Sequence, residues 1–165
     1  MTAAHVIAKA KTLIGNKGGE LFWRAYGYSN RVAWCCIFCW YLFQDDPALF
    51  YNGGKTAYVP ALWDWAKKAG LIQAEPQPGD MVVYDWNNNG GGDHVGLVVG
   101  VHETTIDTIE GNVDDQVKAL SRSRAASPGY KIMGYIRPLY TTNDHQCSPD
   151  TCPIMQNLRD LLKNN

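Results

Sequence analysis

The stretch that decides the fold is Ala33-Trp34-Cys35-Cys36-Ile37-Phe38-Cys39-Trp40-Tyr41-Leu42-Phe43. No charged side chain interrupts it, so a helix over 34–44 would be buried almost all round. The following Asp45-Asp46-Pro47 ends that helix, because proline cannot continue it. A cysteine at the start of a helix meets unpaired backbone N–H groups and the positive end of the helix dipole, which both favour the thiolate. Cys35 is therefore a candidate nucleophile.

The composition predicts one globular domain. The chain has 165 residues, of which 45% are hydrophobic and 19% charged, enough for a real core. The net charge of −1 gives no basic excess for holding a polyanion, so we expect no nucleic-acid partner. No run approaches the roughly 18 apolar residues that span a bilayer, so we expect no membrane insertion. We expect a monomer.

The spacing of apolar residues changes along the chain. It predicts a helix over 3–14, a loop over 16–32, and a further helix over 60–69 that Gly70 caps. After residue 76, turn signals alternate with runs rich in Val, Ile and Tyr. These runs predict strands over 81–84, 94–101, 104–109 and 131–140. Helices followed by antiparallel strands indicate an α+β fold.

The C-terminal part differs in composition. We assign 1–140 to the catalytic domain and 141–165 to a linker or tail, with a short helix from Ile154. Cys147 and Cys152 lie in this polar tail and could pair in an oxidising setting. The helical cysteines Cys36 and Cys39 are expected to be packing residues.

A catalytic thiol needs a base and a group that orients the base. His94 stands at the head of an apolar strand and is the candidate base. Glu110 and Asn112 end the next strand and share one face if the chain is extended there. A carboxylate on one imidazole nitrogen stabilises the imidazolium and leaves the other nitrogen to the thiol.

Four motifs occur in a specific order: Trp34-Cys35-x-x-Phe38, Gly79-Asp80, Asp93-His94-Val95-Gly96 and Ile109-Glu110-Gly111-Asn112. In this order they closely resemble the CHAP family, the cysteine- and histidine-dependent amidohydrolases and peptidases. The resemblance runs from the first helix to about Tyr140. It implies a papain-like fold, in which N-terminal helices pack on an antiparallel sheet.

The resemblance also implies roles for individual residues. The nucleophile follows the tryptophan, which selects Cys35 over Cys36. By the same matching His94 is the base, Glu110 its orienting partner and Asn112 an accessory polar group. No side chain clearly matches an oxyanion donor. Ser29 and Asn30 are candidates, and the Cys35 backbone N–H is the alternative.

The function that this resemblance implies is hydrolysis of an amide bond in bacterial peptidoglycan. The enzyme would be an N-acetylmuramoyl-L-alanine amidase, or an endopeptidase of the stem peptide or cross-bridge. Residues 1–11 lack the pattern of a secretory signal peptide. This suits a phage endolysin that reaches the wall after lysis, or a domain of a larger secreted protein.

Two alternatives stay open at this point. One is a non-catalytic wall- or peptide-binding module that has kept a papain-like groove. Fast, single-site labelling by iodoacetamide would separate an activated thiolate from such a module. The other is the related NlpC-type peptidase, which usually orients its base with a second histidine or another polar residue.

The residues before His94 form a possible metal loop. Asp85, Asn87, Asn89 and Gly90 match the start of an EF-hand-type calcium loop, and Asp93 falls at its ninth position. The twelfth position is glycine, where a bidentate glutamate belongs. The pattern therefore favours an Asn/Gly-rich turn. We expect that catalysis requires no cofactor, and a structural calcium ion at 85–93 is left open.

Overall fold

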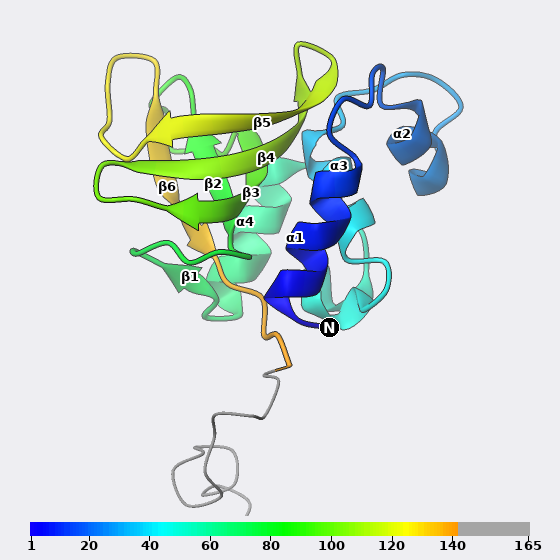
Figure 1. Ribbon diagram of the computed structural model, residues 1–165, viewed down its shortest axis with the longest axis horizontal. Coiled ribbons are helices and arrows are strands. Elements are labelled where there is room, and N and C mark those ends of the chain that lie inside the picture. The colour runs from blue at the N-terminus through cyan, green and yellow to red at the C-terminus, as the bar shows by residue number, and fades with distance from the viewer. Residues whose placement is uncertain (142–165) are drawn as a thin grey trace, which may run out of the picture.

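Four α-helices lie along one side of a six-stranded antiparallel sheet in the computed structural model (Figure 1), which describes residues 1–141. The helices are α1 (Ala3–Thr12), α2 (Glu20–Tyr26), α3 (Cys35–Leu42) and α4 (Val59–Lys68). Two short 3₁₀ helices, η1 (Pro47–Leu49) and η2 (Tyr51–Gly53), connect α3 to α4. The expected α+β class is confirmed.

The sheet is built from sequential hairpins with one long return. Its strands are β1 (Ile72–Gln73), β2 (Met81–Asp85), β3 (His94–Val101), β4 (Thr105–Val113), β5 (Gln116–Ser123) and β6 (Lys131–Ile136). They pair in the order β1-β6-β2-β3-β4-β5. The last strand therefore returns across the sheet to lie between β1 and β2.

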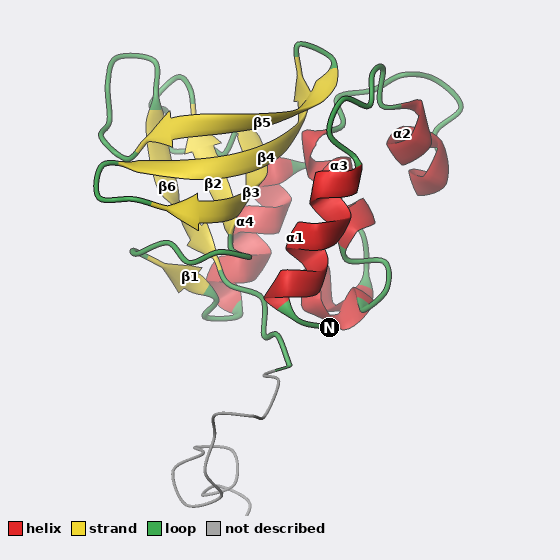
Figure 2. Cartoon of the chain, in the orientation of Figure 1, coloured by secondary structure: helices red, strands yellow, loops and turns green. Residues whose placement is uncertain are grey.

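Helix α3 is the centre of the core, as its apolar run predicts. Five of its eight side chains have no exposed surface: Cys36, Ile37, Phe38, Cys39 and Leu42. The helix packs against β3 and β4 and also contacts α1 and α2, and in the view of Figure 2 it is partly hidden behind α1. A helix enclosed on all sides can hold its first residue in a fixed place relative to the sheet.

The sheet has a second apolar face. Residues alternate between its two faces, so Val83, Val95, Leu97 and Ile109 join the helix-side core. The opposite face carries a smaller buried cluster of Val82, Tyr84, Val98, Ile106 and Tyr135. By the same registers His94 and Glu110 belong to this opposite face.

Two expectations about the elements are wrong. Residues 20–26 form α2 inside the predicted loop, because the glycines at 19 and 27 adopt positive φ and bound a short helix. Residues 116–123 form β5, for which no strand was expected. Asp114 and Asp115 have φ of 47° and 60°, so two residues suffice to turn the chain from β4 into β5.

The chain leaves the sheet close to where it began. The strand expected over 131–140 ends at Ile136, shortly before Pro138, which lacks an N–H for a ladder. Thr141 then donates its backbone N–H to the carbonyl of Met1 at 3.1 Å. The tail from residue 142, with its expected helix and the pair Cys147 and Cys152, lies outside the described residues. Within residues 1–141, no helix is long and apolar enough to cross a bilayer.

Candidate active site

Cys35 is the first residue of α3, and Trp34 precedes it as the N-cap. The Trp34 ring is fully buried and stacks on Phe22 with centroids 5.2 Å apart. Its Nε1 donates to Oδ1 of Asp115 at 3.3 Å, in the turn between β4 and β5. The tryptophan thus anchors the start of the helix to the hairpin, which gives the Trp-Cys pair a structural reason. The next residue, Cys35, is 8% exposed.

His94 is the first residue of β3 and faces both expected partners. Its Nε2 lies 2.9 Å from Oε2 of Glu110. Cys35 interacts with the same ring and is among the groups that raise its pKa. Because Nε2 is engaged by the carboxylate, the nitrogen available to the thiol is Nδ1. The structure therefore brings Cys35, His94 and Glu110 together, with the carboxylate hydrogen-bonded to the ring.

The electrostatics of the pair favour a charged imidazole. Burial opposes protonation of His94, but the hydrogen bonds and charges of Cys35 and Glu110 outweigh it and raise its pKa from 6.5 to about 9. Burial likewise opposes ionisation of Glu110. Hydrogen bonds from His94 and Arg122 outweigh it and lower the pKa of the carboxyl to about 2. At neutral pH the site thus holds an imidazolium beside a carboxylate.

Glu110 is fully buried, and both of its oxygens are occupied. Oε1 accepts from the hydroxyls of Tyr84 at 2.9 Å and Thr108 at 2.7 Å. Arg122 on β5 donates from Nε to Oε1 at 3.0 Å and from Nη2 to Oε2 at 2.7 Å. A buried carboxylate with this many donors has one fixed orientation, so it can fix the ring of His94.

Two aromatic rings hold the imidazole from the side. Tyr84 and Trp86 lie 5.8 Å and 5.6 Å from the His94 centroid, each at an interplanar angle of 29°. These rings also stack on each other, with centroids 4.8 Å apart. The guanidinium of Arg122 lies over both of them. The stack restricts rotation of the histidine and covers the Glu110 network.

Two motif glycines are required by close packing. A Cβ on Gly96 would lie 2.4 Å from Cγ of Glu110. A Cβ on Gly111 would lie 2.5 Å from the Cβ of Phe38 and 2.9 Å from the Trp34 ring. The first glycine makes room for the carboxylate, and the second lets β4 approach α3. These contacts explain the glycine in each of the two motifs, Gly96 in Asp93-His94-Val95-Gly96 and Gly111 in Ile109-Glu110-Gly111-Asn112.

The other cysteines of α3 differ from Cys35 in their surroundings. Cys36 donates its thiol to the carbonyl of Thr56 at 3.3 Å, and its side chain is fully buried. Burial, followed by the neighbouring Cys35, raises the pKa of Cys36 well above its ordinary value, and burial does the same for Cys39. Both are therefore neutral thiols in the core, as packing residues should be.

Asn112 is placed differently from what an extended strand predicts. Its φ is 64°, and the pairing of β4 with β5 shifts register between Glu110 and Val113. This bulge breaks the alternation that would put Asn112 on the face of Glu110. In the part of the chain that the structure describes, the Asn112 side chain makes no hydrogen bond to Cys35 or His94. Its accessory role stays a prediction.

The sequence did not point to four residues of this network: Tyr84, Trp86, Thr108 and Arg122. Thr108 and Tyr84 could have been found from strand alternation, since both fall on the face of Glu110. Arg122 required knowledge of β5. The oxyanion candidates Ser29 and Asn30 lie exposed in the segment that precedes α3.

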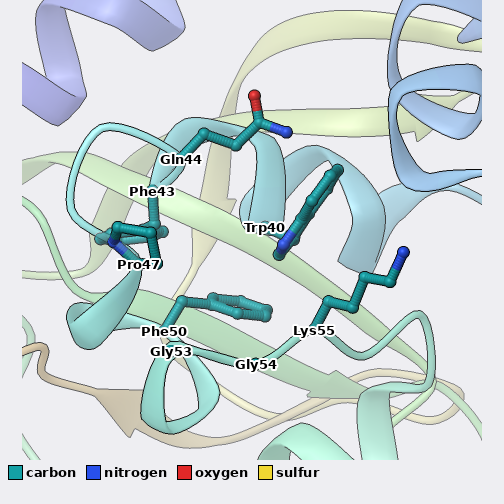
Figure 3. Close-up of a pocket in the computed structure, with 8 residues that line it drawn as sticks. All are labelled: Trp40, Phe43, Gln44, Pro47, Phe50, Gly53, Gly54 and Lys55. Atoms are coloured by element: carbon teal, nitrogen blue, oxygen red, sulfur yellow. The ribbon is translucent and has the colours of Figure 1, made fainter.

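A cavity of about 310 Å³ opens at Cys35. Its walls come from the segment before α4 and from the loop before His94. They are lined by the small residues Ala33, Ala57, Gly91 and Gly92 and by the aromatic Tyr58. Tyr58 is 67% exposed, so its ring is free to contact a ligand. A larger pocket of about 470 Å³ lies farther along α3, between Trp40, Phe50 and Lys55 (Figure 3). Cys35 does not line that pocket, so the chemistry belongs to the smaller cavity.

The loop before His94 is a tight turn organised by its own carboxylates. Asp85 accepts the backbone N–H groups of Asn87 and Asn89 on Oδ1, both at 3.2 Å, and that of Gly90 on Oδ2 at 2.9 Å. Asp93 accepts the backbone N–H of Trp86 at 2.8 Å. These bonds fit the Asn/Gly-rich turn that the sequence favours. Calcium at this loop stays an open prediction.

Comparison with known proteins adds one match. The model of the CHAP domain family matches residues 27–112, just over half of the chain. The matched segment begins before α3 and ends at Asn112, so it contains Cys35, His94 and Glu110. No curated protein matches the chain.

Proposed function

The chain belongs to the CHAP domain family, and from this premise we propose that it hydrolyses an amide bond of bacterial peptidoglycan with Cys35 as nucleophile. CHAP domains are generally cysteine- and histidine-dependent amidohydrolases or peptidases, and peptidoglycan is the substrate that the family suggests. The specific proposal is an N-acetylmuramoyl-L-alanine amidase or a stem-peptide or cross-bridge endopeptidase.

One observation carries the proposal: a helix-terminal cysteine at an open cavity lies beside a histidine that is hydrogen-bonded to a buried carboxylate. The charged imidazole supports a thiolate at Cys35, because opposite charges in contact stabilise each other. The orienting group on Nε2 is a carboxylate, which favours this mechanism over that of an NlpC-type peptidase with a second histidine.

The chemistry follows from these positions. The Cys35 thiolate attacks the amide carbonyl, and the backbone N–H of Cys35 at the helix start stabilises the resulting oxyanion. The imidazolium of His94 then gives its proton to the leaving amine, and the C–N bond breaks to leave a thioester. Neutral His94 next takes a proton from water, whose oxygen attacks the thioester; the C–S bond breaks, the acid is released, and the thiolate and imidazolium are restored.

Several features of the proposal concern the setting of the enzyme. Catalysis needs no metal ion, because the thiolate and the imidazolium supply both nucleophile and acid. The protein acts as a monomer on the bacterial wall, as an endolysin released by lysis or as a domain of a larger secreted protein. Asn112 is an accessory polar group at the edge of the site.

Mass spectrometry of muropeptides tests the proposal. Purified walls of several chemotypes are digested with the wild type, with Cys35→Ala and with Cys36→Ala as a matched control on the same helix. We expect the wild type and Cys36→Ala to release the same amide-cleavage products, and Cys35→Ala to lose at least roughly a thousandfold in rate. The mass of each product identifies the bond and separates an amidase from an endopeptidase.

Two outcomes would contradict the proposal. Full cleavage by folded Cys35→Ala with loss in Cys36→Ala would move the nucleophile to Cys36. Binding to walls without any cleavage product, in the wild type as in Cys35→Ala, would leave a non-catalytic wall-binding module.

A further inference from the structure

The buried carboxylate of Glu110 has two cationic neighbours, and only one of them takes part in proton transfer. His94 and Arg122 share Oε2, at 2.9 Å and 2.7 Å. Arg122 also reaches Oε1 through Nε, so it grips both carboxylate oxygens. The Glu110 side chain has no exposed surface, whereas that of Arg122 is 24% exposed. The guanidinium therefore stands between the buried charge and solvent.

The proposed reaction changes the charge on His94. When the imidazolium gives its proton to the leaving amine, Glu110 loses its cationic partner on that side. An unpaired buried carboxylate is strongly unfavourable, so it would oppose this step unless another cation remained. Arg122 stays charged throughout, and its contact with Glu110 raises the pKa of the guanidinium further.

We propose that Arg122 is a positioning residue of this site, which keeps Glu110 ionised and fixed so that His94 can release and regain its proton. The inference rests on the proposed function for the roles of Cys35 and His94. Arg122 touches neither the thiol nor the cavity at Cys35, so it acts only through Glu110 and through the rings of Tyr84 and Trp86 beneath it.

The titratable and charged groups that face the Glu110–His94 pair come from every element packed against it. They are Cys35 and Cys39 from α3, Tyr84 from β2, Lys118 and Arg122 from β5, and Tyr130 just before β6. Lys118 lies opposite Glu110 in the ladder, but its ammonium pairs with Asp114. Burial, followed by the charge of Glu110, raises the pKa of Tyr84, and both tyrosines are neutral over the range in which enzymes work. Arg122 is thus the cation of the set that binds Glu110 and stays charged.

The test measures the formation of the thiolate–imidazolium pair without any wall substrate. The rate of Cys35 alkylation by iodoacetamide is followed against pH by mass spectrometry of the peptide that contains Cys35, in wild type, Arg122→Gln and Arg122→Lys. The acid limb of this profile is the pH range over which the alkylation rate rises with pH. Removing a positive charge favours protonated forms, so we expect the acid limb of Arg122→Gln to lie about 1 pH unit above that of the wild type. Arg122→Lys keeps the charge but loses the two-point contact, and its limb should move the same way by less.

Arg124→Gln is the matched control. It removes the same charge two residues away, from an arginine that pairs with the exposed Glu75 and not with Glu110. Its limb should coincide with that of the wild type. Circular dichroism confirms that each variant is folded, and if Arg122→Gln does not fold, Arg122→Lys carries the test.

The inference and the proposed function fail in different ways. An unmoved acid limb in a folded Arg122 variant, or an equal shift in Arg124→Gln, overturns the role of Arg122 while Cys35 remains the nucleophile. Amide cleavage by Cys35→Ala would instead overturn the proposed function. In wall digestion, a moved pH profile of kcat for Arg122→Gln supports positioning, whereas a lower rate with an unchanged profile contradicts it.

Discussion

At the scale of single residues, the buried carboxylate of Glu110 depends on an arginine that lies 12 residues away in the sequence. Cys35, His94 and Glu110 stand in motifs that name them. Arg122 stands in Ser121-Arg122-Ser123-Arg124, where nothing local separates it from its exposed neighbour. The residue directly opposite Glu110 on β5 is Lys118, whereas Arg122 lies opposite Ile106 and reaches the carboxylate diagonally along the ladder. Long-range pairing of this kind leaves no mark in a short window of sequence.

Substitutions of His94 and Glu110 should differ in kind. We expect His94→Ala to reduce wall hydrolysis as far as loss of the thiol does, at least roughly a thousandfold, because the two act as a unit. Glu110→Gln should cost less, roughly a hundredfold, since an amide can still bond to the ring. In the profile of activity against pH, Glu110→Gln should also shift the fall on the alkaline side to lower pH. The reason is that Glu110 helps to raise the pKa of His94 to about 9.

The measurement is the pH dependence of kcat for muropeptide release by the wild type and Glu110→Gln. Identical profiles from pH 6 to 10 would show that Glu110 does not orient the base. Asn112 would then become the better candidate, with Asn112→Ala as the next variant.

At the scale of elements, apolar periodicity predicted α1, α3, α4 and the central strands because each is long or strongly buried. It missed α2 and β5 for different physical reasons. Helix α2 has seven residues bounded by glycines, which read as loop. Strand β5 alternates exposed and half-buried residues, most of them polar, and Val117 is its one buried side chain. Its position follows from the Asp-Asp turn and not from its own hydrophobicity.

The contact of β4 with α3 can be tested by filling it. Gly111→Ala places a Cβ against the side chains of Phe38 and Trp34, which are fully buried and have no room to move away, so we expect a loss of about 1–3 kcal/mol in the free energy of unfolding. Gly100→Ala is the control, since its Cβ meets only the side chain of Asp107, which is largely exposed. Urea unfolding measures both. Equal stability of the two variants would mean that β4 has room to move away from α3.

The loop over 85–93 gives a prediction about metal. We expect wall hydrolysis to survive EDTA, because the proposed steps use a thiolate and an imidazole. Added calcium should raise the melting temperature by no more than about 2 °C, through the turn before His94. Activity that disappears in EDTA and returns with calcium alone would contradict this. Asp85, Asn87, Asn89 and Asp93 would then be the first ligands to mutate.

At the scale of the whole molecule, the fold brings two distant segments together at one point. Helix α3 supplies the thiol from its first turn, and the far face of the sheet supplies the histidine and carboxylate. The α+β class followed from the order of helices and strands. The curvature of the sheet that brings the thiol close to the histidine could not be predicted, because it depends on how the strands twist and bulge together.

The buried ion pair should shape stability against pH. The pKa of Glu110 is lowered from 4.5 to about 2, so its contribution is complete above 4.5 and is lost as pH falls toward 2. The pKa of His94 is raised from 6.5 to about 9, so its contribution is complete below 6.5 and is lost as pH rises through 9. We expect the melting temperature to be highest between about pH 4.5 and 6.5. A melting temperature that rises from pH 6.5 to 9 would contradict the assignment, and Glu110→Gln should flatten both slopes.

The measurement that tests the central claim most directly is a titration of activity against modification of Cys35. The wild type is treated with increasing iodoacetamide at neutral pH, and each sample is divided between a muropeptide-release assay and mass spectrometry of its cysteine peptides. We predict that Cys35 reacts before Cys36 and Cys39, and that activity falls in direct proportion to its alkylated fraction. Full activity in a sample whose Cys35 is completely alkylated would contradict the account.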